Sequence, residues 1–413
     1  MMVLLAIVIL LAVATGEGVL HRLTYFLVLG LAGSYVRARL SLWRLDMWVE
    51  KQASVAQVGE MLEGFIYVRN NSPVPTGWVE VVQLSDMHGH ICGGATRLPA
   101  RGSEAWNAQR RCYIRGVYTV GPLVARSSDP LGLFRVQVKR GGPIPVVIYP
   151  PALELPYFRL PEATLLGEER VRRGSQIGSS QVGSVREYIH GDSISRIHWP
   201  STAKCGRLMS KDFDSPAGSD VWVVLDLERG IHESKDMERT DEYAVAIAAS
   251  LARLVLTEER SVGLMAYGDQ EYLLPLGSGT KQMSRVLEIL ARSRTEGEIP
   301  LAEVLLQNTV KLGRLASLLI VTSSTDTDWV PVLQGLVYRG LSIAVVLVDS
   351  MSFGGDQSCC DLLTTLVSAG IPVYVVRRGD SLPIALSRQM TLHDAPFFEQ
   401  YTAPELTPAS LLH

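Results

Sequence analysis

The 413-residue chain has few cysteines, little net charge and none of the familiar catalytic motifs. Its five cysteines are odd in number and scattered, which indicates free thiols in a reducing compartment and no zinc cluster. A formal net charge of -3 provides no basic field for a nucleic-acid partner. No HExxH, GxSxG or phosphate-binding P-loop sequence is present. The sequence therefore predicts no cofactor and no catalytic residue.

The composition is that of a packed globular protein with an apolar start. Hydrophobic residues make up 47% of the chain and charged residues 20%, and the length suits two or three domains. Residues 1–40 contain two apolar runs, at 1–14 and 23–36, separated by a turn at 15–18 and followed by Arg37, Arg39 and Arg44. Each run is shorter than the roughly 20 residues of a comfortable span.

Two interpretations of this segment remain. In the first, residues 1–40 are a membrane hairpin of two short transmembrane helices. The arginines then place all soluble parts on the cytoplasmic side of the plasma membrane. In the second, residues 1–14 are a secretory signal and the protein is an exported adhesion protein. The absence of an initial basic region and the second apolar run favour the hairpin.

Residues 46–150 alternate between apolar and polar positions, which is typical of strands exposed on one face. The pattern predicts strands at 65–70, 78–84, 112–122, 133–139 and 146–150, separated by turns rich in proline, glycine and asparagine. Short strands at this spacing predict an antiparallel β-sandwich-like domain. The following residues 151–183 are rich in proline and then in glycine, serine and arginine. They predict a linker and a mobile loop.

Residues 219–390 alternate strands with helices. Strands are predicted at 221–227, 261–268, 271–277, 317–324, 341–349 and 371–376, and helices at 241–258, 280–292, 301–312, 328–339 and 361–369. This alternation predicts an α/β fold with a doubly wound, mostly parallel sheet. Residues 391–413 are predicted to form a loosely docked tail.

Asp226 and Glu228 follow the first strand of this domain, where ligands bind in open α/β sheets. The strand order resembles the von Willebrand factor A domain, whose metal-ion-dependent adhesion site uses an Asp-x-Ser-x-Ser loop with a Thr and an Asp from two further loops. Here Asp226 is retained, but Gly230 replaces the last Ser of the first loop, Ile299 stands where the Thr would be, and Ser323 stands where the Asp of the third loop would be. A hard cation needs six or more oxygen ligands. The resemblance thus implies a degenerate metal site and a protein-binding platform.

Residues 184–216 are dense in charge. The pattern predicts a strand ending near Glu187, a helical turn capped by Asp192 or Ser193 and ended by Pro200, a turn at 203–206 and a returning strand at 207–213. Ile197 and Trp199 are expected to pack inward. Two interpretations stay open: a structural knot of buried ion pairs, or a docking and anion-binding surface built from Arg186, Arg196, Lys204 and Arg207.

This segment also resembles the signature of the bacterial family called domain of unknown function 58. The matching positions are Arg186, Glu187, Tyr188, Gly191, Asp192, Arg196, Ile197, Trp199, Ala203, Gly206, Leu208 and Phe213. Pro200 departs from the family pattern, which usually has a polar residue there. The resemblance implies an accessory role beside a MoxR-type AAA+ ATPase and assigns no catalytic residue.

The sequence thus predicts a membrane-anchored, non-enzymatic interaction or adaptor protein. The candidate binding residues are Arg186, Glu187, Tyr188, Gly191, Asp192, Arg196, His198, Trp199, Lys204 and Arg207. The alternative is a metal-dependent binding protein or an enzyme that uses the strand-end site at Asp226, with Glu228 and His198 as further candidates.

Overall fold

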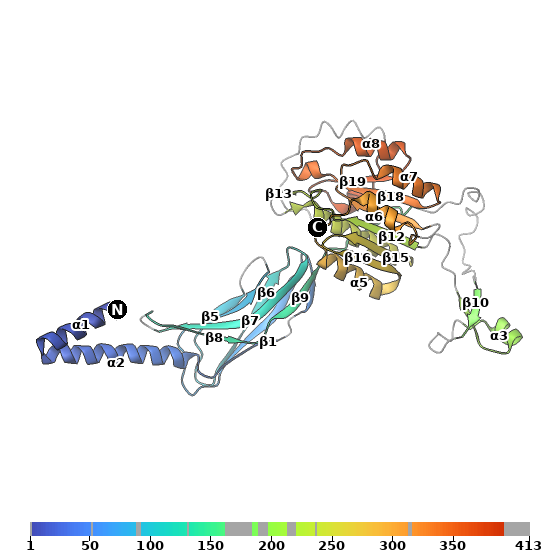
Figure 1. Ribbon diagram of the computed structural model, residues 1–413. Coiled ribbons are helices and arrows are strands. Elements are labelled where there is room, and N and C mark those ends of the chain that lie inside the picture. The colour runs from blue at the N-terminus through green and yellow to red at the C-terminus, as the bar shows by residue number, and fades with distance from the viewer. Residues whose placement is uncertain are drawn as a thin grey trace. The chain divides into compact units, whose positions relative to one another are not determined.

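The computed structural model describes residues 2–50, 53–87, 92–129, 132–161, 184–188, 197–212, 220–235, 238–312 and 316–391. The chain divides into two compact units, Met1–Tyr149 and Pro150–His413 (Figure 1). The predicted tail lies outside the described residues except for its first position, and so do residues 162–183 of the predicted linker and loop.

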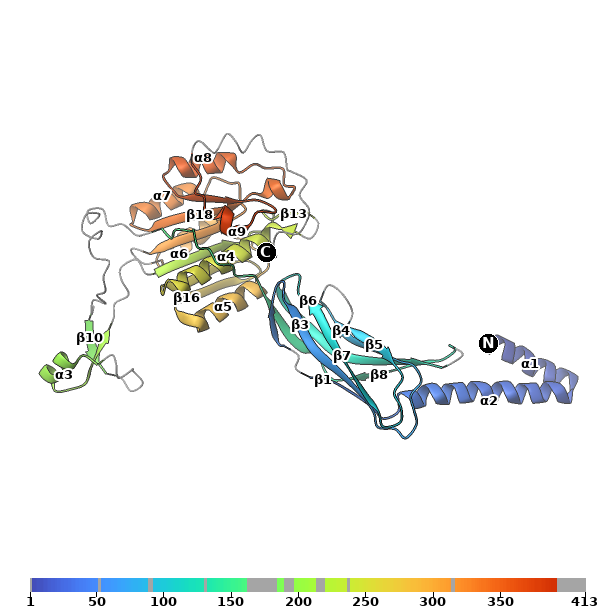
Figure 2. The ribbon, with the colours of Figure 1, turned by 180° about the vertical axis from the view of Figure 1, so that it is seen from behind.

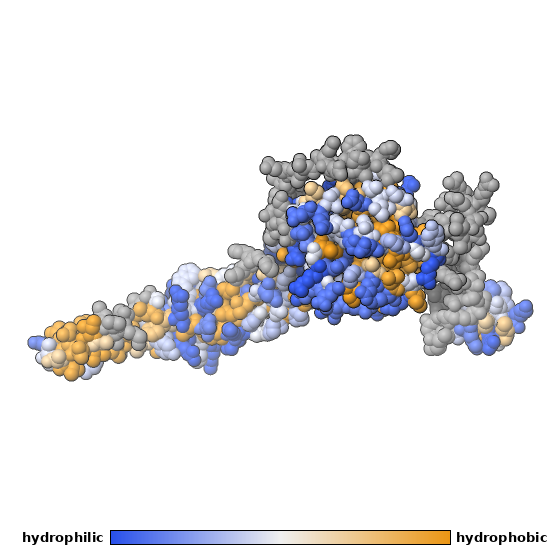
Figure 3. All heavy atoms as spheres, turned by 45° about the horizontal axis from the view of Figure 1, so that its top comes forward, coloured by the Kyte–Doolittle hydropathy of each residue, from blue (hydrophilic) through white to orange (hydrophobic). Residues whose placement is uncertain are grey.

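The first unit begins with two helices, α1 (Met2–Thr15) and α2 (Gly18–Ser41). Figure 3 shows this end of the chain as a mainly apolar surface. Among the described residues, α2 alone is long and apolar enough to cross a membrane, because α1 has only 14 residues. The structure therefore supports one candidate span, whereas the sequence predicted a hairpin of two.

Two sheets follow the helices. The first has the order β1-β3-β6 and is antiparallel, with β1 (Leu45–Glu50), β3 (Met61–Asn70) and β6 (Ser103–Arg111). The second has the order β2-β9-β7-β4-β5, with β8 paired to β7; its strands are β2 (Val55–Gln57), β4 (Val79–Ser85), β5 (Gly93–Thr96), β7 (Gly116–Ser128), β8 (Arg135–Arg140) and β9 (Ile144–Tyr149).

Apolar side chains from both sheets form one core. Leu45 and Ile66 of the first sheet pack with Val79 and Leu123 of the second, and all four are buried. The arrangement agrees with the predicted sandwich-like domain, with the difference that β2 and β9 pair in parallel. A second difference concerns residues 112–122. The segment before Gly116 is an irregular connection, in which the Cys112 N–H donates to the Glu60 carbonyl oxygen, and β7 begins only at Gly116.

A set of contacts that we call the α2 brace joins helix α2 to the β7–β8 turn. It consists of Ser34, Tyr35, Asp129 and Phe134. The Ser34 hydroxyl donates to Oδ2 of buried Asp129 at 2.8 Å, and the Phe134 N–H donates to Oδ1 at 2.6 Å. The rings of Tyr35 and Phe134 meet edge to face, with centroids 5.5 Å apart. The connection between the predicted strands 112–122 and 133–139 therefore also holds the helix.

The second unit contains a six-stranded sheet of order β16-β15-β12-β17-β18-β19. Its strands are β12 (Asp220–Asp226), β15 (Ser261–Tyr267), β16 (Glu271–Gly277), β17 (Ser317–Thr322), β18 (Ser342–Val348) and β19 (Val373–Val376). All neighbouring pairs are parallel except β15 with β16. The prediction of a mostly parallel α/β sheet is confirmed.

Helices cover both faces of this sheet (Figure 2). Val223 and Leu225 of β12 pack in the core under α4 (Thr240–Thr257), α5 (Gly279–Arg292) and α9 (Leu382–Ala385). Trp222 and Val224 pack in the opposite core, under α6 (Leu301–Asn308), α7 (Val330–Tyr338) and α8 (Cys360–Ser368). A strand buried on both faces explains why this part of the sequence is continuously apolar. The 3-10 turn η3 (Ser350–Phe353) follows β18, and the short pair β13 (Ser234–Lys235) and β14 (Glu238–Arg239) precedes α4.

The proline-rich stretch 150–161, predicted as part of a linker, instead packs on the α/β domain. Ala152, Leu155 and Phe158 are buried in the core that α4 covers, and the Phe158 and Tyr374 rings are 4.7 Å apart. The Arg253 guanidinium donates to the Ala152 carbonyl oxygen at 2.7 Å. Prolines disfavour regular structure, but apolar side chains spaced three residues apart still bury one side of an irregular chain.

Candidate functional site

The charged segment of the sequence folds as a small antiparallel unit, which we call the β10–α3–β11 module (residues 184–188 and 197–212). Strand β10 (Ser184–Glu187) pairs with β11 (Met209–Asp212), with Glu187 opposite Met209. Helix α3 (Trp199–Cys205) lies between them in the chain. Both predicted strands are therefore present. Gly191, Asp192 and Arg196, as well as the proposed cap Ser193, lie outside the described residues.

His198 caps helix α3. Its Nδ1 lies 2.7 Å from the Ser201 hydroxyl and accepts from the Ser201 N–H at 3.3 Å. Pro200 occupies the first turn of the helix, where its missing N–H costs nothing, and Gly206 ends the helix at φ 67°. The prediction that Pro200 ends a turn was therefore wrong, because a proline in the first helical turn is equally compatible with the sequence. The predicted turn 203–206 is the last part of α3 and its cap.

The module exposes a large apolar side chain and two cationic side chains. Trp199 is 62% exposed, and Leu208, Lys204 and Arg207 are also exposed. The Arg207 guanidinium lies 3.3 Å from the Glu187 carboxylate, and because both side chains are exposed this ion pair adds little stability. Ile197 is buried as predicted, whereas the expectation that Trp199 packs inward was wrong because α3 has no buried residue.

Of the remaining candidates, Arg186 lies in β10 and pairs across the strands with Ser210. The Tyr188 N–H donates to the Leu208 carbonyl oxygen at 2.9 Å, which extends the strand pairing by one residue. The module therefore brings Glu187, Tyr188, Arg207 and Leu208 together at the end of the hairpin next to α3.

A second region lies at the carboxyl ends of β12 and β17. Strand β12 lies between β15 and β17 in the sheet. After β12 the chain first forms β15 and β16 on one side of this strand, and it then crosses to form β17 on the other side. Such a reversal is where α/β sheets place ligand sites. Asp226 ends β12 and Thr322 ends β17, so the two side chains lie at this point.

Asp226 is held by internal hydrogen bonds. Its Oδ2 accepts from the Thr322 hydroxyl at 2.6 Å, and its Oδ1 accepts from the Glu228 N–H at 3.1 Å. The side chain is only 5% exposed, and burial raises its pKa to about 6, although the hydrogen bond from Thr322 acts in the opposite direction. Each carboxylate oxygen thus already has a partner inside the protein.

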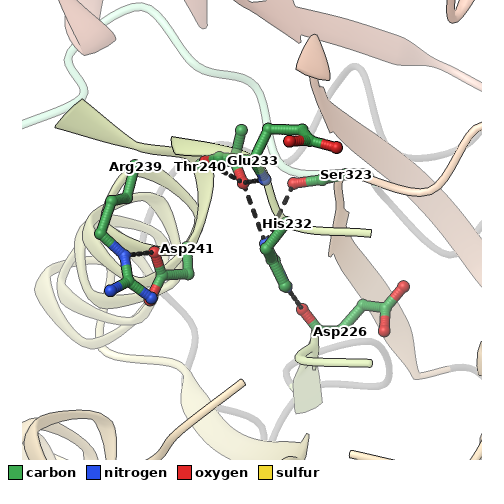
Figure 4. A network of polar contacts seen from close by, with 7 residues as sticks. All are labelled: Asp226, His232, Glu233, Arg239, Thr240, Asp241 and Ser323. Carbon is green, nitrogen blue, oxygen red and sulfur yellow. Dashed lines mark hydrogen bonds and ion pairs between the residues drawn. The ribbon is translucent and has the colours of Figure 1, made fainter. Parts of the chain in front are cut away.

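His232 connects this strand end to helix α4 (Figure 4). Its Nε2 lies 3.2 Å from the Asp226 carbonyl oxygen, and its Nδ1 lies 3.1 Å from the Thr240 hydroxyl and 3.5 Å from the Ser323 hydroxyl. A carbonyl oxygen only accepts, so Nε2 carries the hydrogen in this contact. The Thr240 and Ser323 partners of His232 come from two other segments of the chain, so only the fold brings this histidine into contact with them.

The other residues considered for a strand-end metal site have different surroundings. Burial raises the pKa of Glu228, and the nearby Asp326 carboxylate adds to the effect. Ile299 packs against the core under α6 and α7, and Ser323 contacts His232. Within the described ranges, no group of three or more His, Cys, Asp or Glu side chains is arranged to hold a metal ion. The degenerate metal site stays a prediction.

A buried thiol lies beside the end of β18. Cys359 Sγ is 3.8 Å from Asp349 Oδ1, and the Arg377 Nε is 3.5 Å from Asp349 Oδ2. Burial, together with the negative charge of the Asp349 carboxylate, raises the pKa of Cys359 to about 12. Burial also raises the pKa of Asp349, against the attraction of Arg377. The thiol is therefore protonated at neutral pH and is unsuited to act as a nucleophile.

Among known proteins, the Bacillus subtilis (strain 168) protein named "Uncharacterized protein YeaD" is 23% identical over 202 residues. The similarity covers 49% of this chain and 48% of that protein, so the chain spans about half the length of the curated relative it matches.

Two solved structures illustrate the structural comparison. The CARDB domain of the PF1109 protein from Pyrococcus furiosus is 15% identical at a TM-score of 0.20, covering 25% of this chain and 88% of that one. The sporulation control protein Spo0M from Bacillus subtilis is 11% identical at a TM-score of 0.18, covering 25% and 48%. These scores are too low to indicate a shared fold.

Residues 184–353 contain the β10–α3–β11 module and the strand ends at Asp226 and Thr322. Over this range the chain matches the family described as "Protein of unknown function DUF58".

Proposed function

We propose that this chain is a membrane-anchored, non-enzymatic interaction protein that binds a protein partner through the β10–α3–β11 module. A MoxR-type AAA+ ATPase is the partner that the sequence resemblance suggests. Helix α2 supplies the anchor, and the arginines that follow its apolar stretch favour a cytoplasmic orientation of the soluble parts.

The observation that carries the proposal is the exposure of Trp199. Trp199 is 62% exposed, and Leu208, Lys204 and Arg207 of the same module are exposed as well, so the module offers an apolar side chain and cations to a partner. Tryptophan and arginine are enriched among the side chains that dominate binding energy at protein interfaces. Lys204 and Arg207 favour an acidic surface on the partner.

The state of the strand end supports a scaffold role for the α/β domain. Both oxygens of the buried Asp226 carboxylate already accept a hydrogen bond, from Thr322 and from Glu228, so each oxygen has one acceptor position occupied by the protein itself.

The test is co-purification from native membranes. Wild-type protein is expected to retain the ATPase, and Trp199→Ala is expected to reduce the retained amount at least tenfold, as for an interface residue worth about 2 kcal/mol. Tyr338→Ala is the matched control, because Tyr338 is another exposed aromatic side chain but lies at the end of α7, outside the module. Unfolding curves of both variants check that the fold is intact.

If wild type and Trp199→Ala retain equal amounts of the ATPase, Trp199 does not contribute to binding and the β10–α3–β11 module is refuted as the binding site. Elemental analysis of the same purified protein examines the metal-dependent alternative. A stoichiometric divalent metal that is lost in Asp226→Asn would favour that alternative over the interaction protein.

A further inference from the structure

The end of the sandwich next to helix α2 carries exposed tryptophans and arginines that the partner-binding proposal does not use. Trp43 is 45% exposed and Trp78 is 67% exposed. Arg44 places its guanidinium carbon 4.7 Å from the centre of the Trp43 ring, and Arg37 and Arg39 are exposed on the last turns of α2. We call Arg37, Arg39, Trp43, Arg44 and Trp78 the collar.

The collar residues are close together because backbone contacts tie their segments to one another. The Gly77 N–H donates to the Ser41 hydroxyl at 2.9 Å, which places Trp78 beside the end of α2. The Ser127 hydroxyl donates to the Trp78 carbonyl oxygen at 2.9 Å, and the Asn71 N–H donates to the Arg44 carbonyl oxygen at 3.0 Å. These hydrogen bonds hold the backbone segments that carry the collar side chains.

The position of the collar along α2 is also fixed. The apolar stretch of α2 ends at Val36, and at a rise of about 1.5 Å per residue Trp43 lies within about 10 Å of that point along the helix axis. The α2 brace ties the helix to the β7–β8 turn at Ser34 and Asp129, so the helix cannot swing away from the sandwich. If α2 spans a bilayer, the collar is at the headgroup layer.

Both side-chain types suit that layer. Tryptophan prefers the membrane interface, where its ring meets the acyl boundary and its N–H meets water, and arginine binds lipid phosphate. Three acidic residues lie near the collar in the described part of the chain, and each has a partner outside it. Asp46 of β1 accepts a hydrogen bond from the Asn71 side chain, Asp129 accepts from Ser34 and Phe134, and Glu80 lies 3.9 Å from Arg126.

We propose that the collar binds the headgroups of anionic phospholipids, with Arg37, Arg39 and Arg44 contacting phosphate and Trp43 and Trp78 lying in the interface. The proposal rests on the membrane anchoring in the proposed function and adds the lipid class that the sandwich recognises.

The experiment uses the full chain reconstituted into phosphatidylglycerol or phosphatidylcholine vesicles whose acyl chains are brominated near the headgroup. Bromine quenches tryptophan fluorescence only at short range. Quenching by brominated phosphatidylglycerol is expected in wild type and in the control Trp199→Phe, and it is expected to be largely lost in the double variant Trp43→Phe with Trp78→Phe. Equal quenching in all three proteins, or quenching in none, overturns the proposal.

A second arm measures lipid selectivity. The association of phosphatidylglycerol relative to phosphatidylcholine is obtained by titrating brominated lipid of each type. It is expected to fall about fivefold for each arginine removed, in Arg39→Gln and in Arg39→Gln with Arg44→Gln. An unchanged ratio overturns the assignment of phosphate to the arginines.

Resistance to alkaline extraction separates this inference from the proposed function. If the protein stays in the membrane but lipid does not quench the collar tryptophans, lipid binding by the collar is refuted and membrane anchoring by α2 is retained. Protein that is extracted by alkali refutes the anchor itself, and the collar with it.

Discussion

At the scale of single residues, Asp226 is the position whose environment departs most from that of an ordinary surface carboxylate. Burial favours its protonated form, and the hydrogen bonds from Thr322 and Glu228 only partly offset that preference. The charge state of one side chain is therefore linked to the stability of the second unit.

This linkage has a definite sign. The pKa of Asp226 in the folded protein, about 6, lies above its ordinary value of 3.8, so its stabilising contribution is complete below pH 3.8 and is lost as the pH rises through 6. A shift of about two pH units corresponds to about 3 kcal/mol. The free energy of unfolding of wild type, relative to that of Asp226→Asn, is expected to fall by about this amount between pH 4 and pH 7.

Chemical denaturation at a series of pH values measures this difference. Asp328→Asn is the control, because the Asp328 side chain is exposed in the β17–α7 loop. If wild type and Asp226→Asn show the same pH dependence, the carboxylate is not desolvated in solution as it is in the structure.

Single residues also mark the limit of sequence reasoning. The position of Asp226 at a strand end follows from the apolar run before it, and the hydrophobic period predicted that placement. The contacts of His232 with Asp226, Thr240 and Ser323 could not be predicted, because they depend on how three separate segments meet at the edge of the sheet.

At the scale of elements, residues 150–161 act as a strap on the α/β domain although they form no helix or strand. Phe158 lies in the core against Tyr374, while the neighbouring Tyr157 is 71% exposed. The Ser317 hydroxyl at the start of β17 donates to the Pro161 carbonyl oxygen at 2.7 Å, which fixes the far end of the strap.

Removing the Phe158 ring is expected to destabilise the second unit by about 3–5 kcal/mol, because it opens a cavity in a packed core. Tyr157→Ala, one residue away on the solvent side, is expected to change the free energy of unfolding by less than about 0.5 kcal/mol. Thermal unfolding of the two variants provides the comparison. Equal effects would mean that the strap contributes nothing to folding stability.

The elements themselves were largely predictable. The apolar run of β12 and the alternation in β3 indicated their burial directly, and the helix and strand order of the second unit follows from the change of period. The strap was missed because its prolines suggested a linker, and because Ala152, Leu155 and Phe158 are too few to indicate burial in a stretch that forms no helix or strand. Trp199 was misplaced because a single aromatic side chain does not reveal which side of a short helix faces solvent.

At the scale of the whole molecule, the two units have separate apolar cores. Ile66 belongs to the core between the two sheets of the first unit, and Leu251 of α4 belongs to a core of the second. Cores that share no residues are expected to unfold separately.

Differential scanning calorimetry of the full chain in detergent is therefore expected to give two transitions. Ile66→Ala is expected to lower only one midpoint and Leu251→Ala only the other, since each removes about 2–5 kcal/mol from its own core. A single transition that both substitutions shift would contradict independent folding of the units.

The α2 brace has a mechanical consequence. Ser34 and Ser41 contact the sandwich at points about two helical turns apart. Because the helix is attached at two points, we expect α2 and the sandwich to move as one rigid body. A bilayer thinner than the apolar length of α2 makes such a helix lean. Any tilt of the helix then rotates the sandwich through the same angle. The orientation of the sandwich relative to the membrane is therefore expected to depend on the thickness of the bilayer.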